Sequence, residues 1–124
     1  MQASYTRIYD GDDGETHFED LSVTLEPQTF APPAAPLNIA PFLGATDTLW
    51  VGADPSWGGD EPHPAPQRQI FCSLRGTYEV TASDGAARRF GPGSVLMLED
   101  TSGKGHATSI IGDEDALIFA VSLD

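Results

Sequence analysis

Three histidines are the side chains of this sequence best suited to chemistry, because an imidazole can bind a metal or carry a proton near neutral pH. His17 lies in a polar stretch and is expected on the surface, so His63 and His106 are the candidates. Residues 63, 69 and 71 are all odd-numbered. Because side chains alternate between the two faces of a strand, one continuous strand would present these three on the same face. Gln69 and Phe71 are therefore predicted to line the same pocket as His63.

Other large side chains could also line such a pocket. Phe71 is the strongest candidate because it shares the expected face of Gln69. The remaining candidates are Trp50, Trp57, Tyr78, Met97 and Phe119. Cys72 is the only cysteine, which excludes an intramolecular disulfide and a multi-thiolate metal site. Its neighbours are apolar, so a buried, inert thiol is expected rather than a nucleophile.

Charge and length limit the partners. The chain has 124 residues and a formal net charge of −13, which would repel nucleic acid. The longest apolar run, residues 116–121, is too short to cross a bilayer. The first residues lack the charged and apolar segments of a signal peptide. We therefore expect one cytoplasmic domain that contacts neither nucleic acid nor a membrane.

Glycine and proline define the elements that must position these side chains. Thirteen Gly and ten Pro interrupt the chain every few residues, which predicts an all-β fold. Residues 5–15 are expected to form a turn-rich lead-in, and residues 26–41 a proline-rich arm outside any central sheet. Residues 54–66 are expected to form a loop. Strands are predicted at 18–25, 48–53, 68–74, 77–82, 87–90, 94–98, 106–111 and 116–123.

These elements predict a sandwich or barrel with at least seven strands in two antiparallel sheets. The whole chain, 1–124, is expected to be a single domain. Residues 1–45 would supply an N-terminal strand and the proline-rich arm, and residues 46–124 the barrel core.

Residues 57–106 resemble the two-motif signature of the cupin superfamily. His63, Ala65, Gln69 and Gly76 fall in the register of the first motif, and the interval from Gly76 to Gly93 matches the usual spacing between motifs. The segments at 63–69 (His-Pro-Ala-Pro-Gln-Arg-Gln) and 103–106 (Gly-Lys-Gly-His) are similar to those of a group of small uncharacterised bacterial cupins. The resemblance implies a cupin-type double-sheet jelly-roll barrel with a site inside it.

The sequence departs from the motif at three positions. Ala65 replaces the second histidine of the first motif, and Gln69 replaces its glutamate. In the second motif the strict count falls on Lys104, and a loop longer by two residues would deliver His106 instead. Glu99, Asp100 and Lys104 flank this motif at a loop, where binding residues concentrate, and an exposed ion pair is expected there. A Glu99 that points inward would instead act as a general acid or base.

The resemblance implies a metal site formed by His63, Gln69 and His106, which would hold a divalent Mn, Fe, Ni, Cu or Zn ion. The alternative is a metal-free pocket in which this site has lapsed. It also implies a protein that binds a small organic molecule. The expected activity is that of a non-redox enzyme, an isomerase, lyase, dehydratase or cyclase, with His63 and His106 as catalytic residues. A dioxygenase is less expected, and the alternative function is a binding or sensing module without catalysis.

A homodimer is the expected assembly. The proline-rich arm and the exposed edges of a sheet both favour pairing between copies, and the cupin resemblance implies the same. Because the charge of −13 opposes association, the dimer should become stronger as salt screens the repulsion.

Overall fold

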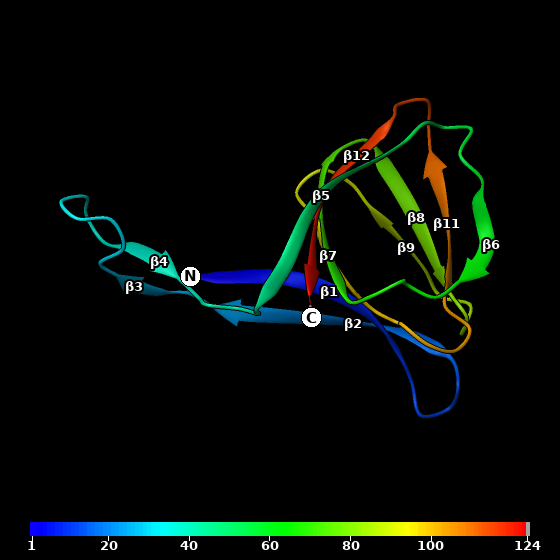
Figure 1. The fold of residues 1–124 in the computed structure, drawn as a ribbon, viewed down its shortest axis with the longest axis horizontal. Coiled ribbons are helices and arrows are strands. Elements are labelled where there is room, and N and C mark those ends of the chain that lie inside the picture. Colours follow the sequence, from blue (N-terminus) through cyan, green and yellow to red (C-terminus); the bar gives the residue numbers. More distant parts are fainter. Residues whose placement is uncertain (124) are drawn as a thin grey trace.

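The computed structural model describes residues 1–123. This range contains twelve strands, connected by turns and loops (Figure 1). No helix occurs in that range, and so none that could span a membrane. A six-stranded sheet has the order β2-β1-β10-β7-β12-β5, and a four-stranded sheet the order β6-β11-β8-β9. The strands of the first sheet are β1 (Gln2–Asp10), β2 (Thr16–Thr24), β5 (Ala45–Ala53), β7 (Gln69–Arg75), β10 (Val95–Glu99) and β12 (Ala116–Leu123). Those of the second are β6 (Gly59–His63), β8 (Thr77–Ala82), β9 (Ala87–Phe90) and β11 (His106–Ile111).

The core lies between these two sheets. Alternate residues of β8 and β12 face inward, as the two-residue period of a strand requires. The buried apolar cluster draws on both sheets, with Val80 from the four-stranded sheet and Leu96 and Ala120 from the six-stranded one. The predicted all-β, cupin-type double-sheet barrel is therefore confirmed.

The first strand corrects two predictions. Residues 5–15 are not a turn-rich lead-in, because β1 runs through Asp10 and only the turn to β2 lies beyond it. The sheets are not purely antiparallel either, since β1 pairs with β10 in parallel, with Ile8 opposite Leu98. Ile8 is fully buried, while Arg7 points outward to Glu19 and Glu99. The polar outward residues hide this strand in the sequence, and its buried side chain extends the core beyond residues 46–124.

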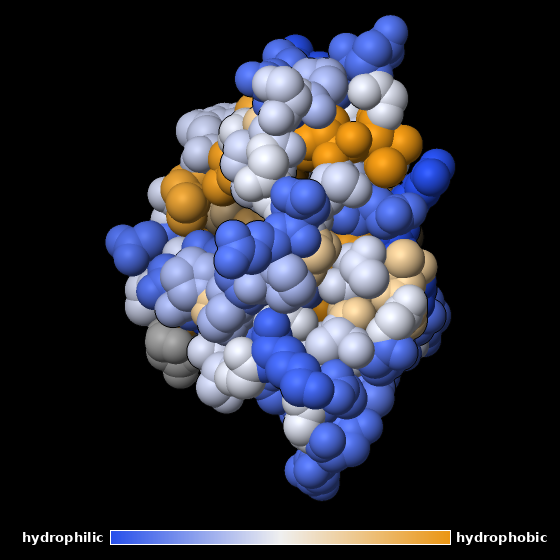
Figure 2. Space-filling model, turned by 90° about the vertical axis from the view of Figure 1, so that its right-hand side faces the viewer, coloured by the Kyte–Doolittle hydropathy of each residue, from blue (hydrophilic) through white to orange (hydrophobic). Residues whose placement is uncertain are grey.

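The proline-rich arm forms a hairpin of its own. β3 (Glu26–Gln28) and β4 (Leu37–Ile39) pair only with each other in the described chain, so the arm stays outside the two main sheets as expected. Figure 1 shows it projecting away from the barrel. The other side of the barrel, beyond β6 and β11, presents many hydrophilic residues, with separate hydrophobic patches in the upper half of the view (Figure 2).

Candidate functional site

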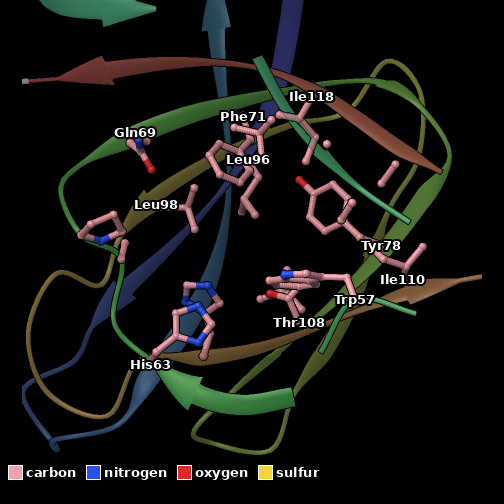
Figure 3. A pocket seen from close by; sticks show the side chains of 18 of the residues that line it. Trp57, His63, Gln69, Phe71, Tyr78, Leu96, Leu98, Thr108, Ile110 and Ile118 are labelled. Atoms are coloured by element: carbon pink, nitrogen blue, oxygen red, sulfur yellow. The ribbon is translucent and has the colours of Figure 1, made fainter. Parts of the chain in front are cut away.

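A cavity of about 350 Å³ opens between the two sheets (Figure 3). Its wall is mainly apolar, with a few polar side chains. Trp57, Phe71 and Tyr78 line it as candidates named from the sequence, whereas Trp50, Met97 and Phe119 do not. The polar lining residues include His63, Gln69, His106 and Thr108. A mostly apolar concave site with a few convergent polar groups is the usual form of a small-molecule pocket.

The two candidate histidines lie side by side at this cavity. His63 ends β6 and His106 begins β11, and the two residues are directly opposite in the antiparallel ladder. Their ring centroids are 5.1 Å apart, with the ring planes at 52°. The predicted loop at 54–66 thus contains a strand, and its pairing with β11 is what brings the rings together.

Gly105 allows this close approach. Its φ is +72°, a conformation that favours glycine. An added Cβ would lie 2.1 Å from the His63 carbonyl carbon and 2.3 Å from the Pro64 nitrogen. The backbone of residue 105 therefore packs directly against the chain that carries His63.

Each imidazole is oriented through its Nδ1 atom. His63 Nδ1 lies 2.9 Å from the Glu61 carbonyl oxygen, which can only accept a hydrogen bond. His106 Nδ1 lies 2.5 Å from Asp100 Oδ2. With Nδ1–H as the donor in both rings, each neutral imidazole keeps an Nε2 lone pair. Neither Nε2 has a hydrogen-bond partner within residues 1–123, so both are available to a ligand.

Asp100 is a functional candidate that the sequence analysis assigned wrongly, because an exposed ion pair was expected and the side chain is instead buried beside His106. Its side chain is completely buried, and the His106 ring beside it is 6% exposed. Asp100 Oδ1 has no hydrogen-bond partner among the described residues. Strand parity could have found this residue, because Leu96 and Leu98 of β10 face inward and position 100 continues that face.

The same parity points Glu99 outward, where it pairs with Arg7 and Arg68. Lys104 is exposed and pairs with Glu15. Of the two alternatives for the second motif, His106 therefore lies at the cavity and Lys104 does not. Glu99 is accordingly a partner in ion pairs and not an inward acid or base.

Gln69 faces the cavity from another side. Its amide nitrogen lies 3.4 Å from the Ser122 hydroxyl, and Figure 3 shows its side chain across the cavity from His63. The reason is topological, because Gln69 belongs to β7 of the six-stranded sheet and His106 to β11 of the four-stranded one. The structure thus brings His63 and His106 together and places Gln69 on the opposite wall.

The donor atoms present do not fit a catalytic metal site. Such sites usually supply three protein ligands, and within residues 1–123 no group of three His, Cys, Asp or Glu side chains could hold an ion. The orientation of both rings through Nδ1 is typical of metal-ligating histidines. Two imidazoles, however, are fewer than the three protein ligands that a catalytic metal site usually has. Metal binding stays a prediction, and the chemistry proposed below uses the chain's own side chains.

Two further groups complete the description. Burial raises the pKa of Tyr78 to about 12, so its phenol is neutral at physiological pH. The thiol of Cys72 is half-buried rather than buried, and desolvation raises its pKa. A raised pKa lowers the fraction of reactive thiolate, in agreement with the expectation that Cys72 is not a nucleophile.

The fold and the cavity define an all-β double-sheet barrel with a mainly apolar pocket between its sheets, the architecture that the cupin resemblance implies. No protein-family model matches the chain, and no curated protein matches it. Among solved structures the chain is similar to the cupin domain of Schizosaccharomyces pombe Cnp3, with 16% identity and a TM-score of 0.47. The match covers 99% of this chain and 84% of that one.

Proposed function

We propose that this protein binds a small, mainly apolar organic molecule in the cavity and exchanges a proton with it through His106. One observation carries the proposal: a buried carboxylate, Asp100, holds the His106 ring at the edge of an apolar cavity. The corresponding activity is non-redox proton transfer, as in an isomerase, lyase, dehydratase or cyclase.

The Asp100–His106 pair supports a general base. Donation from Nδ1 to the carboxylate fixes the tautomer that leaves a lone pair on Nε2. When Nε2 accepts a proton, the nearby carboxylate stabilises the resulting imidazolium. The apolar wall strengthens this attraction, because charges interact more strongly where the effective dielectric constant is low.

His63 is suited to a second proton-transfer role. Its ring adjoins that of His106, so a proton removed from one atom of the ligand could be returned to another by the neighbouring imidazole. Isomerisation and elimination both need such paired transfers. The side chain of His63 is exposed to solvent, and it can therefore also exchange its proton with water.

A binding or sensing module is the second candidate. The exposure of His63 favours it, because solvent water competes for protons at an open site. Such a module would use the two Nε2 atoms only as hydrogen-bond acceptors, and Asp100 would only hold His106 in place.

The two functions are separated by proton exchange in heavy water. Small aromatic and aliphatic ketones and hydroxyketones are incubated with the protein in D₂O, and NMR follows both their binding and the loss of protons next to the carbonyl. We expect His106→Gln to slow this exchange by about 10²–10⁴-fold, the usual contribution of a general base. His17→Gln, which changes a histidine outside the cavity lining, is the matched control.

Each outcome decides between the candidates. Exchange that His106→Gln abolishes and His17→Gln preserves would support proton transfer. Binding without exchange of any compound would support the binding module. If no compound binds, a small-molecule function of this class is wrong.

A further inference from the structure

The charges around the cavity disfavour an anionic ligand. Of the residues 1–123 that the structure describes, those lining the cavity include no Lys, Arg, Asp or Glu. The buried carboxylate of Asp100 lies directly behind the His106 ring, and the whole chain has a net charge of −13. An anion that entered this apolar space would lose its water without gaining a positive partner, and the surrounding charge would repel it. The cavity is therefore suited to a neutral or cationic molecule.

An indole ring forms part of the cavity wall. Trp57 lines the cavity and is 45% exposed. Its ring lies against Gly59, where an added Cβ would be 2.0 Å from the ring carbon Cη2. Gly59 is paired with Thr108 of β11, and Figure 3 shows the indole beside Thr108. Because an indole face attracts cations more strongly than the ring of Tyr or Phe, Trp57 gives the cavity a surface that can bind a cation.

The strand β11 sets the spacing between Trp57 and the proposed base. Thr108 and His106 are two positions apart on this strand, and both line the cavity. Since a strand advances about 3.3 Å per residue, the indole beside Thr108 lies roughly 7 Å along the strand from His106. One aromatic ring with substituents at its two opposite ends spans such a gap.

We propose that the cavity binds an organic ammonium ion that also carries a carbonyl group, with the cation on the face of Trp57 and the carbon next to the carbonyl at His106 Nε2. This inference rests on the proposed function and names its ligand class, a ketone with an ammonium group. Apolar side chains such as Phe71, Leu96 and Leu98 would enclose the body of the molecule. An apolar cavity of about 150 Å³ holds a benzene ring, so a cavity of about 350 Å³ has room for the ring and both substituents.

Three ketones of nearly the same shape test the charge alone. 4-Acetyl-N,N,N-trimethylanilinium, 4-tert-butylacetophenone and 4-acetylbenzenesulfonate share an acetyl group and differ in the charge at the opposite end of the ring. Isothermal titration calorimetry measures their binding in about 1 M NaCl, where a Debye length of about 3 Å screens the general attraction of the chain for cations. We expect the wild-type protein to bind the cation at least as tightly as the neutral ketone. The sulfonate should bind about tenfold more weakly than either, or worse, because its charge finds no partner.

Two tryptophan substitutions locate the bound cation. Trp57→Leu removes the indole face, so the preference for the cation over the neutral ketone should fall about two- to thirtyfold, the range of one cation–π contact. The neutral ketone should still bind to this variant. Trp50→Leu is the matched control, because Trp50 is exposed on β5 and does not line the cavity. It should leave the preference unchanged.

A measurement on the wild-type protein alone covers the case in which Trp57→Leu does not fold. NMR should detect nuclear Overhauser contacts between the N-methyl protons of the bound cation and the Trp57 ring. Contacts of these protons with other rings only would overturn the inference.

The binding results separate this inference from the proposed function. If the neutral ketone binds but the cation binds more weakly, or the sulfonate binds as tightly as the cation, the inference is wrong and the proposed function stands. The same holds if Trp57→Leu keeps the full preference for the cation. If none of the three ketones binds, the proposed function and this inference are both wrong for ketones.

Discussion

Gly105→Ala is the substitution that most directly tests how the histidine pair is positioned. The added Cβ meets two separate costs, an unfavourable backbone conformation and a collision with the chain next to it. Gly112→Ala at the other end of β11 is a matched control. Gly112 also has a positive φ, +84°, but nothing lies within 4 Å of its added Cβ.

The magnitudes follow from these two environments. A non-glycine residue in the left-handed region costs about 1–2 kcal/mol, and we expect Gly112→Ala to lower the free energy of unfolding by that amount. In Gly105→Ala the Cβ would lie only 2.1 Å from the His63 carbonyl, so the backbone of β6 must move away. Overpacking of this kind adds about 1–3 kcal/mol, for a total loss of about 2–5 kcal/mol.

Urea unfolding followed by far-ultraviolet circular dichroism measures both losses. Displacement of β6 should also separate His63 from His106, so Gly105→Ala should weaken the binding of a probe ketone that the wild-type protein binds, at urea concentrations where the variant is still folded. Gly112→Ala should bind the probe as the wild type does. Equal destabilisation by both substitutions, with probe binding intact, would refute the packing argument.

Four other expectations concern the rest of the molecule. Hydrogen bonds to Asp13 and Asp84 raise the pKa of His17, so its contribution to stability is complete below its unfolded pKa of about 6.5 and is lost as pH rises through the folded value. His17→Gln should therefore destabilise the protein at about pH 6 and much less at about pH 9, and a loss independent of pH would contradict this. In Gly59→Ala the new Cβ would lie 2.0 Å from the Trp57 ring, so the indole should leave its place, with a red-shifted emission and little change in stability; an unchanged spectrum would argue against the contact. Elemental analysis of protein purified without chelator or nickel resin tests the metal that the sequence predicts at His63, Gln69 and His106: about one ion per chain would support that prediction, and a metal-free chain would contradict it and agree with the separation of Gln69 from the two histidines. Light scattering at tens of micromolar protein should show a homodimer that strengthens with salt, and a monomer at low and high salt would reject that prediction.

The sequence predicted strands and turns correctly where the alternation of apolar side chains and the positions of glycine and proline agree. The hairpin from β7 to β8 and the turn at Gly76 follow from alternating apolar residues and one glycine. The opposition of His63 and His106 agrees with the motif resemblance, even though 43 positions separate them in the chain. That opposition depends on β6, which was expected to be loop because its residues are Gly, Asp, Glu, Pro and His. Pairing with β11 overrides these weak local preferences.

The positions of Gln69 and Asp100 depend on contacts between strands, which the spacing of residues along the chain does not determine. Gln69 shares parity with His63, but parity places side chains on one face only while both residues belong to one strand. Here the chain changes sheet between β6 and β7, and Gln69 faces the histidines from across the interior. Asp100 was expected in an exposed ion pair because an aspartate beside Thr, Ser, Gly and Lys suggests a solvated loop, whereas its side chain continues the inward face of β10.

The parallel pairing of β1 with β10 also has a consequence during synthesis. About ninety residues separate Ile8 from its neighbour Leu98. At a translation rate of about 5–20 residues per second, β10 follows β1 from the ribosome by roughly 5–20 s. Throughout that interval, one edge of β1 has unpaired backbone groups, and Ile8 lacks its contact with Leu98 of β10. Unpaired strand edges readily recruit other chains, so the nascent protein has a period of vulnerability to aggregation that ends only when β10 arrives.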